Sequence, residues 1–303
     1  MNPIKKIAYR VLKKMKFLPP EFYVKIYYEY HTGKKMNMTR PREFNEKIQW
    51  IKVFYKPDIL TRLVDKLAVR NYVSEKIGKK YLNKLLAVYR HPDEIDFNRL
   101  PDQFVLKGTH GSNYNLIVKN KNDISHRRVK RLAKKWLGRN YYYRLGLEWA
   151  YKNVPPAIIA EAYMEEQGKK SLTDYKFYCF SGKARLIQVD TDRNSDGDHR
   201  MTYFDLNWKK LPFTKVNKTM FEGEIKRPEN LSEMITFAEA LADKFPFVRV
   251  DFYSVNGRSV FGEMTFYPGD GRTDFYPDKY NEIIGSYIEL PELKKGEKYI
   301  KTI

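Results

Sequence analysis

The chain has 303 residues, 42% of them hydrophobic, and its 57 lysines and arginines against 37 aspartates and glutamates give a net charge of +20. This length allows a sizeable core and two domains or several lobes, and the charge indicates a negative partner such as a nucleotide, a nucleic acid, an anionic polymer or an acidic membrane surface. A single cysteine, Cys179, excludes a disulfide framework and a CxxC metal cluster, and no apolar stretch is long enough to predict a transmembrane helix.

Residues 1–18 have the spacing of a basic amphipathic helix. Charged residues interrupt any apolar core of a secretory signal, so we expect a cytoplasmic protein. The apolar residues are Ile4, Ile7, Ala8, Val11, Leu12 and Met15, and the basic residues are Lys5, Lys6, Arg10, Lys13, Lys14 and Lys16. Two interpretations stay open: the helix packs on the rest of the chain, or it attaches the protein to an anionic surface on the inner face of the membrane.

The remaining chain is predicted to mix helices with short strands. Helical spacing and glycine stops predict helices over residues 61–77, from Ser125 to Leu137, on to about Tyr151, and over residues 231–244. Strands are predicted at 85–90, on both sides of a glycine loop at 108–113, and at 157–164, 174–180, 184–190, 199–205, 247–253 and 258–266. Antiparallel hairpins with interspersed helices indicate the α+β class.

The last hairpin carries two acidic residues whose positions depend on the register of its turn. A two-residue loop at Asn256 and Gly257 puts Asp251 and Glu263 on opposite faces, whereas a three-residue loop pairs Arg249 with Glu263. The three-residue loop sends every apolar side chain to one face, so burial favours it. The polar face then carries Arg249, Asp251, Glu263 and Thr265, and the apolar face carries Val248, Val250, Phe252, Val260, Met264 and Phe266.

Two neighbouring carboxylates on that polar face favour a cation. Mg²⁺ prefers a few carboxylates together with substrate phosphates, so the hairpin predicts a magnesium site. The alternative is an exposed ribbon in which Arg249 forms a cross-strand ion pair with Glu263 and Asp251 has no role.

A glycine-containing loop follows the strand that ends at Lys107. The loop has no GK[ST] sequence and no helix after it, so it is not a Walker loop. A glycine loop between antiparallel strands can close over a triphosphate while a strand lysine contacts the phosphates. The alternative for the loop is an ordinary hairpin with no ligand. His110 lies in this loop and either contacts the phosphate or is a polar side chain with no ligand.

Five stretches of the sequence together resemble the ATP-grasp superfamily, and most closely its TupA-like branch, which is associated with bacterial polysaccharide and teichuronopeptide synthesis. They are FNEKIQW at 44–50, VDKLAVRNYV at 64–73, FVLKGTHGSNYN at 104–115, DYKFYCFSGKARLIQVDTDR at 174–193 and FPFVRVDFYSVNGRSVFGEMTFYPGDG at 245–271. The resemblance implies an ATP-grasp fold of two α+β lobes that clasp ATP. Its units are a helical basic segment at 1–56, a lobe at 57–103, a small lobe at 104–165 and a large lobe at 166–303.

The resemblance also implies roles for individual residues. The nucleotide-binding residues are Lys107 for the α- or β-phosphate, Gly108, His110, Gly111 and Ser112 in the loop over the triphosphate, Glu161 and Met164 for adenine, and Asp174 and Lys176 for ribose and phosphate. The metal ligands are Asp251, Glu263 and Thr265, and Thr265 stands where many relatives have Asn, which weakens a second Mg²⁺ site. Arg249 steadies the transferred phosphoryl group, and Arg193, His199 and Arg200 bind the acyl substrate, unless they belong to an ordinary exposed loop.

The implied activity is a carboxylate–amine ligase that uses ATP and Mg²⁺ and forms an acyl phosphate. Its implied partners are an anionic polysaccharide or uronic-acid acceptor and an amino acid or amine. Two rival classes remain. A glycosyltransferase would bind a sugar nucleotide through the Asp190-Thr-Asp192 pattern. A nucleic-acid-binding protein would stack bases on its 24 tyrosines and 18 phenylalanines among basic residues, but the sequence has no nucleic-acid-binding motif.

Overall fold

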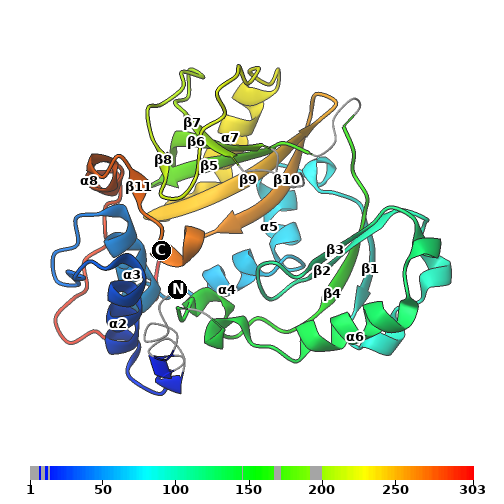
Figure 1. Ribbon diagram of the computed structural model, residues 1–303, viewed down its shortest axis with the longest axis horizontal. Helices are drawn as coiled ribbons and strands as arrows, with labels where there is room; N and C mark the ends of the chain where they lie inside the picture. The colour runs from blue at the N-terminus through cyan, green and yellow to red at the C-terminus, as the bar shows by residue number, and fades with distance from the viewer. Residues whose placement is uncertain (1–6, 8–10, 13, 145, 167–171, 192–199) are drawn as a thin grey trace.

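The computed structural model describes the chain except for residues 1–6, 8–10, 13, 145, 167–171 and 192–199. The described residues form two main antiparallel sheets and a third of two short strands, with helices around them (Figure 1). The strands are β1 (Leu85–Tyr89), β2 (Phe104–Gly108), β3 (Asn115–Val118), β4 (Ile158–Ala162), β5 (Asp174–Phe180), β6 (Lys183–Thr191), β7 (Arg200–Phe204), β8 (Thr214–Lys215), β9 (Phe247–Val255), β10 (Arg258–Thr265) and β11 (Phe275–Tyr276). The helices are α2 (Pro20–Thr32), α3 (Phe44–Phe54), α4 (Ile59–Val64), α5 (Val69–Lys76), α6 (His126–Leu137), α7 (Leu231–Ala242) and α8 (Lys279–Ser286). The predicted α+β class is confirmed.

The smaller sheet has the strand order β1-β4-β2-β3. Phe104 and Leu106 of β2 are fully buried on the side that α6 covers, while Val105 and Lys107 alternate with them and turn to the opposite face. α6 begins at Ser125, whose hydroxyl accepts a hydrogen bond from the Arg128 N–H, as expected of an N-cap. The sheet therefore has one face packed on a helix and one face turned toward the rest of the molecule.

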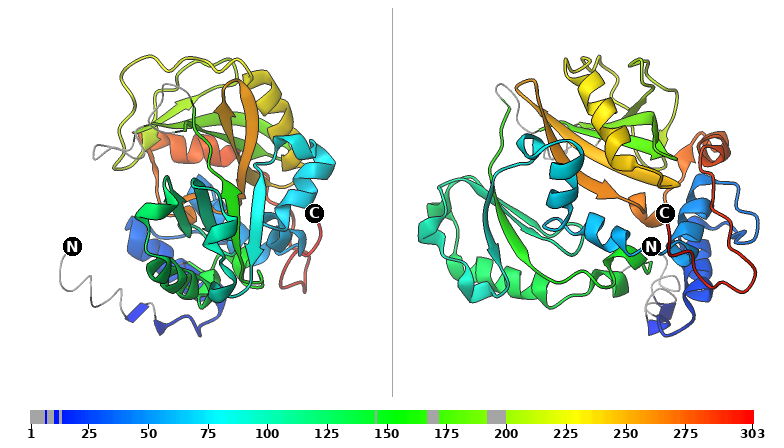
Figure 2. Two further views of the ribbon diagram at one scale, coloured as in Figure 1. Left: turned by 90° about the vertical axis from the view of Figure 1, so that its right-hand side faces the viewer. Right: turned by 180° about the vertical axis from the view of Figure 1, so that it is seen from behind.

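The larger sheet has the strand order β10-β9-β5-β6-β7. Its apolar face includes Val250, Phe177 and Ile187, which are cross-strand neighbours, and α7 packs on this face (Figure 2). Cys179 lies there with its thiol next to the Ala238 carbonyl of α7, so it is a core residue as predicted. On the other face, Phe44 of α3 packs on Phe247 at one end, and polar side chains follow toward the smaller sheet.

The final hairpin has a different register from the predicted one. Asn256 and Gly257 form a two-residue turn with φ angles of 51° and 76°, and Val255 pairs with Arg258. A bulge at Gly262 then shifts the pairing, so that Glu263 lies opposite Asp251 and Thr265 opposite Arg249. The predicted three-residue loop is wrong, but the bulge places the same four polar residues on one face.

Two apolar residues of the hairpin change places for the same reason. Between the turn and the bulge, Phe261 pairs with Phe252 and joins the apolar face. Val260 pairs with Tyr253 and lies on the same side as Asp251, which corrects its predicted position.

The single helix predicted over residues 61–77 is two helices, α4 and α5. The chain becomes extended at Asp65, whose carboxylate accepts a hydrogen bond from the Leu67 N–H, and the Lys66 N–H donates to the Thr109 carbonyl. The break thus directs Lys66 toward the glycine loop. The helix predicted to reach about Tyr151 is also wrong: two short 3₁₀ turns occupy this stretch, and Leu147 between them has a φ angle of 59°, which a helix does not allow.

Helices α2, α3 and α8 form a group beside the larger sheet (Figure 1). α3 is buried along most of its length and packs on α2, on α8 and on the turn after β10. β1 pairs with β4, so the segment predicted as a separate lobe at 57–103 shares a sheet with β2, β3 and β4. The division into four units stays a prediction. Among the residues that the structure describes, no helix is long and apolar enough to cross a membrane.

Candidate functional site

The polar face of the larger sheet carries a row of side chains to which all five strands contribute. Glu263, Asp251, Lys176, Gln188 and Tyr203 are successive cross-strand neighbours from β10 to β7. Cross-strand neighbours project from the same face about 5 Å apart, so the row forms a continuous polar track.

Arg249 joins the two carboxylates at one end of this track. Its Nε and Nη2 donate to Asp251 Oδ1 and Oδ2, each at 2.7 Å, and Nη2 also contacts Glu263 Oε1 at 3.3 Å and Thr265 Oγ1 at 3.1 Å. Burial raises the pKa of Asp251 to about 6, an effect that the positive charges of Arg249 and Lys176 oppose. One guanidinium therefore contacts all three predicted metal ligands.

Lys176 occupies the middle of the track between further carboxylates. Its ammonium lies 2.8 Å from Asp174 Oδ2 and 3.0 Å from Asp190 Oδ2. The Gln188 amide donates to Asp190 and accepts hydrogen bonds from the hydroxyls of Tyr178 and Tyr203. The predicted pair of Asp174 and Lys176 is thus brought together.

The smaller sheet contributes cations on the face opposite α6. Lys107 Nζ lies 2.7 Å from Glu161 Oε2, and the Arg70 guanidinium of α5 lies 3.0 Å from Glu161 Oε1. Glu161 is 6% exposed, and a buried carboxylate held by two cations orients both of them. Arg70 was not among the predicted site residues. It lies in the VDKLAVRNYV stretch that carries the resemblance, which is the signal that could have found it.

The glycine loop packs tightly on aromatic side chains. A Cβ atom on Gly108 would lie 2.9 Å from the Tyr114 side chain, and one on Gly111 would lie 2.7 Å from the Tyr141 ring. Ser112 hydrogen-bonds to the Tyr141 side chain. These contacts explain why glycine is needed at both positions.

His110 points away from the loop's open side. The ring is 2% exposed, and its Nε2 lies 2.9 Å from the Trp136 carbonyl of α6. Burial lowers the pKa of His110, so it is neutral at physiological pH. The structure therefore does not bring His110 to Lys107 and Arg70. The alternative prediction, a polar side chain with no ligand, describes it.

Lys66 connects the glycine loop to the carboxylate hairpin. Its ammonium donates to the Gly111 carbonyl at 2.8 Å and lies 3.9 Å from Glu263 Oε2. Burial lowers the pKa of Lys66, and Glu263 opposes this effect. The loop and the hairpin, which are predicted to act together, therefore lie on the two sides of one lysine. Sequence reasoning also missed Lys66, because only the break between α4 and α5 turns it toward the loop.

A small pocket lies between the two sheets at this point. It is lined by Lys66, Arg70, Leu82, Lys107, Ile159, Glu161, Phe261 and Gly262. Both sheets supply its walls, so a ligand bound there contacts the lysine of β2 and the bulge of β10 together.

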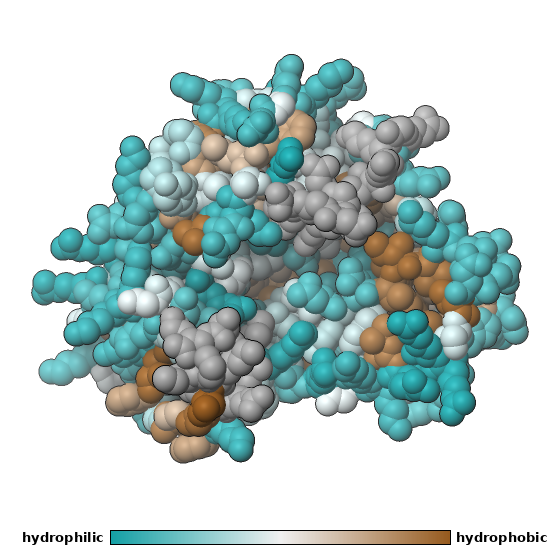
Figure 3. All heavy atoms as spheres, viewed as in Figure 1, coloured by the Kyte–Doolittle hydropathy of each residue, from teal (hydrophilic) through white to brown (hydrophobic). Residues whose placement is uncertain are grey.

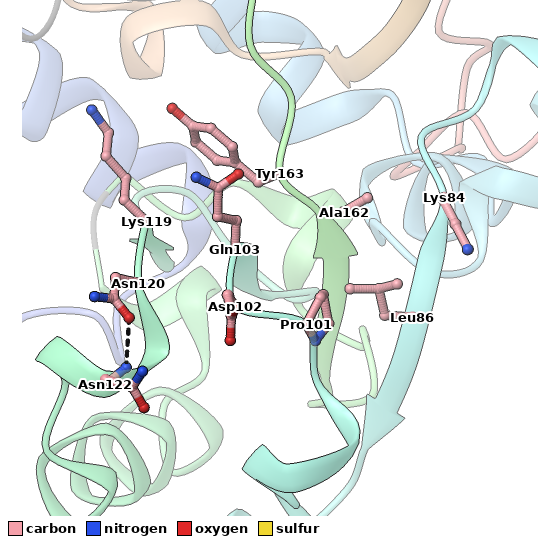
Figure 4. A pocket seen from close by; sticks show the side chains of 10 residues that line it. All are labelled: Lys84, Leu86, Pro101, Asp102, Gln103, Lys119, Asn120, Asn122, Ala162 and Tyr163. Atoms are coloured by element: carbon pink, nitrogen blue, oxygen red, sulfur yellow. Dashed lines mark hydrogen bonds between the residues drawn. The ribbon is translucent and has the colours of Figure 1, made fainter.

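An open groove of about 850 Å³ adjoins the other end of the smaller sheet (Figure 4). It is lined by Lys84, Leu86, Pro101, Asp102, Gln103, Lys119, Asn120, Asn122, Ala162 and Tyr163. Met164, which is predicted to contact adenine, is half-buried just beyond these residues in the chain and does not line the groove.

The predicted acyl-substrate residues are only partly described. Arg193 and His199 lie outside the described residues, as does Asp192 of the rival Asp-Thr-Asp pattern. Arg200 begins β7, and its guanidinium lies over the Phe221 ring with 5.5 Å to the ring centroid. The structure does not bring Arg200 into contact with the cluster around Arg249.

The donor set at the hairpin fits a hard divalent cation. Asp251 and Glu263 are direct cross-strand partners with Thr265 beside them, which gives two carboxylates and one hydroxyl. In the described part of the chain, no group of three or more His, Cys, Asp and Glu side chains is arranged to hold a metal. A Mg²⁺ ion here needs further oxygen ligands, as expected when substrate phosphates complete its coordination.

A family model described as TupA-like ATPgrasp matches residues 46–289, which is most of the chain. The chain belongs to the TupA-like ATP-grasp family. This match contains both sheets, Lys66, Arg70 and the whole of the polar track. No curated protein matches the chain.

Several solved structures are similar to this ATP-grasp protein at low identity. The ATP-grasp ligase PsnB complexed with a minimal precursor, Mg and ADP is 11% identical, with 73% of this chain and 57% of that chain covered and a TM-score of 0.40. D-alanine–D-alanine ligase from Bacillus anthracis complexed with ATP is 15% identical, with 69% and 55% covered and a TM-score of 0.40. N5-carboxyaminoimidazole synthetase from Staphylococcus aureus complexed with ADP is 13% identical, with 76% and 52% covered and a TM-score of 0.41. The chain spans just over half the length of these proteins, and the family assignment rests on the match over residues 46–289.

Proposed function

We propose that this ATP-grasp protein is an ATP- and Mg²⁺-dependent carboxylate–amine ligase that works through an acyl phosphate. The observation that carries the proposal is the convergence of Lys66, Arg70 and Lys107 with Arg249 and the carboxylates of the hairpin around the space between the two sheets. Cations from both sides suit a triphosphate, and paired carboxylates suit the metal that accompanies it.

Each side chain has a defined task in this proposal. Lys107 and Arg70, held by Glu161, bind phosphate oxygens, and the loop from Gly108 to Ser112 covers them with backbone N–H groups. Asp251 and Glu263 hold Mg²⁺, which supplies neutralisation of the developing negative charge. Arg249 has to release one of the carboxylates to admit the ion, and is then positioned to contact the transferred phosphoryl group.

The reaction needs no nucleophile from the protein. A carboxylate oxygen of the acyl substrate forms a bond to the γ-phosphorus while the bond to the β–γ bridging oxygen breaks, which gives an acyl phosphate and ADP. The amine then attacks the acyl carbon and loses a proton as phosphate leaves. Positioning and charge neutralisation are the contributions expected of the side chains described above.

We further infer that the acyl substrate is a uronic acid of a bacterial cell-surface polysaccharide and that an amino acid or amine is joined to it in the cytoplasm. The net charge of +20 supports an anionic acceptor. The outer face of α6 adds exposed Arg127, Arg128, Arg131, Lys134 and Lys135 to the small lobe. Such a field raises the local concentration of a polyanion at low ionic strength.

Calorimetry with Mg-ATP tests the nucleotide part of the proposal. We expect Lys107→Ala and Glu263→Gln each to weaken Mg-ATP binding by about tenfold or more, because each removes a charged contact to phosphate or metal. Lys183→Ala serves as the charge-matched control, since Lys183 is 69% exposed and pairs with Glu239 at the edge of the larger sheet. Binding of sugar nucleotides without binding of ATP would contradict the ligase and favour a glycosyltransferase.

ADP release tests the substrate part separately. With ATP, Mg²⁺ and an amine present, we expect a polyuronate to stimulate ADP release and an uncharged glucan of similar length to leave it unchanged. Equal stimulation by both polymers would contradict an acidic acceptor but not the binding of ATP.

A further inference from the structure

We propose that Ile7, Val11 and Phe17, together with the outer face of α2, form a surface that docks on an anionic lipid bilayer. Five of the fourteen large hydrophobic residues that are exposed in the described part of the chain lie within residues 7–26, which concentrates exposed apolar surface in a small part of the molecule. They are Ile7, Val11, Phe17, Phe22 and Ile26, and we call them the apolar patch. Figure 3 shows apolar atoms gathered at the lower left, at the corner where Figure 1 places α2.

The apolar patch is distinct from the face that packs on the molecule. Leu12 lies in a small core with Tyr23, Val24 and Tyr27, and Met15 and Leu18 pack against it. The fold has therefore already buried one set of apolar residues, and the apolar patch projects from the other side. Of the basic helix predicted over residues 1–18, the structure describes residues 7, 11, 12 and 14–18, and the rest lies outside the described residues. Both interpretations of this segment stay predictions.

On α2 the two faces follow the helical period. Tyr23 and Tyr27 are almost fully buried, whereas Phe22 and Ile26, four residues apart, share the outer face. Phe17, in the turn before the helix, is 82% exposed. Glu21 and Lys25 are also exposed on this helix, so its outer face mixes charged and large apolar side chains. Large apolar side chains on a solvated helix face indicate a partner surface.

The charge around the apolar patch selects the partner. Residues 1–18 contain six lysines and arginines and no acidic residue, and Lys14 and Lys25 are exposed in the structure. Basic residues around an apolar surface complement the negative headgroups of an anionic bilayer while the aromatic rings enter its interface. A second copy of the chain is a poor partner, because symmetric pairing would bring two equally basic segments together.

Flotation of the full-length protein with lipid vesicles tests this proposal. We expect the protein to bind mixed vesicles of phosphatidylglycerol and phosphatidylcholine at least about tenfold more tightly than vesicles of phosphatidylcholine alone. Binding to the mixed vesicles should weaken when NaCl is raised from about 0.1 to about 0.5 M. Lys14→Glu/Lys25→Glu should lose the preference for phosphatidylglycerol. Equal binding to both kinds of vesicle, or binding to neither, would overturn the proposal.

Substitution within the apolar patch separates a membrane from other partners. We expect Phe17→Ser/Phe22→Ser to weaken vesicle binding about tenfold or more, while Ile283→Ser, at an exposed apolar position on α8 outside the apolar patch, leaves it unchanged. Unchanged melting temperatures and Mg-ATP affinities would show that the variants are folded. The membrane proposal is overturned if the double variant binds vesicles as tightly as the wild type. It is also overturned if random oligonucleotide binds the wild type and displaces it from the vesicles. A third contrary result is a wild-type dimer in sedimentation that does not bind vesicles and that the double variant does not form.

Discussion

At the scale of single residues, the cations around the proposed site are held by carboxylates, and the buried Lys215 is an informative contrast. Lys107 and Arg70 share Glu161, Lys176 lies between Asp174 and Asp190, and these ion pairs fix the side chains that the proposed function uses. Lys215 instead donates to the Thr273 carbonyl at 2.8 Å, and its ammonium lies 3.4 Å from the centre of the Phe275 ring. Burial lowers the pKa of Lys215 to about 7 against an ordinary value of 10.5.

Lys215→Met should therefore stabilise the protein in a pH-dependent manner. Between pH 7 and 10.5 the unfolded chain binds one more proton at this lysine than the folded chain, so the free energy of unfolding rises with pH across that window. Below pH 7 the full cost of burying the cation is present. Methionine removes this cost and loses one hydrogen bond, so we expect a gain of about 2 kcal/mol near pH 6 that fades toward pH 10. Urea unfolding at several pH values measures it, with exposed Lys183→Met as a control that shows no such trend.

At the scale of elements, the bulge in the final hairpin decides which way Glu263 points. The Asn256-Gly257 turn by itself would place Glu263 on the face opposite to Asp251. Gly262 adds one unpaired residue to β10, and the rest of the strand is then aligned with Asp251 and Arg249. The bulge thus completes the carboxylate pair and also borders the pocket between the sheets.

Gly262→Ala should disturb this pair. A Cβ atom at this position would lie 3.0 Å from the Asp251 carbonyl oxygen and 3.3 Å from the Tyr253 ring, and backbone atoms of a paired strand cannot easily move away. We expect a loss of about 1 kcal/mol of stability and a several-fold weaker Mg-ATP affinity. Gly138→Ala is the matched control, because its Cβ would meet only ordinary contacts at the end of α6. Equal Mg-ATP affinities for the two variants would show that the bulge does not position the metal ligands.

At the scale of the whole molecule, α3 is joined to the turn after the final hairpin through a buried ion pair. Lys52 of α3 is fully buried, and its ammonium lies 2.6 Å from Asp270 Oδ1. Gln49 of the same helix donates to the carbonyls of Asp270 and Gly271. Asp270 itself has a φ angle of 60°, so these contacts hold the turn in a conformation that a non-glycine residue rarely adopts.

Lys52→Met should be strongly destabilising. Removal of Lys52 leaves the buried Asp270 carboxylate with only the Arg272 guanidinium, 3.7 Å away, so we expect a loss of about 3 kcal/mol. Thermal and urea unfolding measure the loss, and Lys35→Met, at an exposed position after α2, should change stability by less than about 0.5 kcal/mol. Lys52→Met/Asp270→Asn should recover part of the loss. A stability equal to the wild type would show that α3 is not coupled to the hairpin turn.

Local sequence patterns sufficed for most strands, for the helices that begin after Ser125 and at Leu231, and for the chemistry of their side chains, but not for the break at Asp65 or the turns before Tyr151. The alternation of apolar and polar residues in the final hairpin, the capped helix after Ser125 and the lysine before the glycine loop are local patterns, because each follows from the periodicity of one element. They sufficed to predict the α+β class, and the phrases around them sufficed for the ATP-grasp family.

Tertiary structure decided which of these residues meet. The bulge at Gly262, the break that turns Lys66 toward Gly111, and the pairing of Arg70 with Glu161 depend on contacts between segments that are far apart in the chain. Burial of His110 against α6 is decided in the same way, since a loop histidine has the same local sequence whether it faces a ligand or a helix. Local periodicity predicts the face of a side chain only within an unbroken element, whereas contacts between distant segments fix its partner.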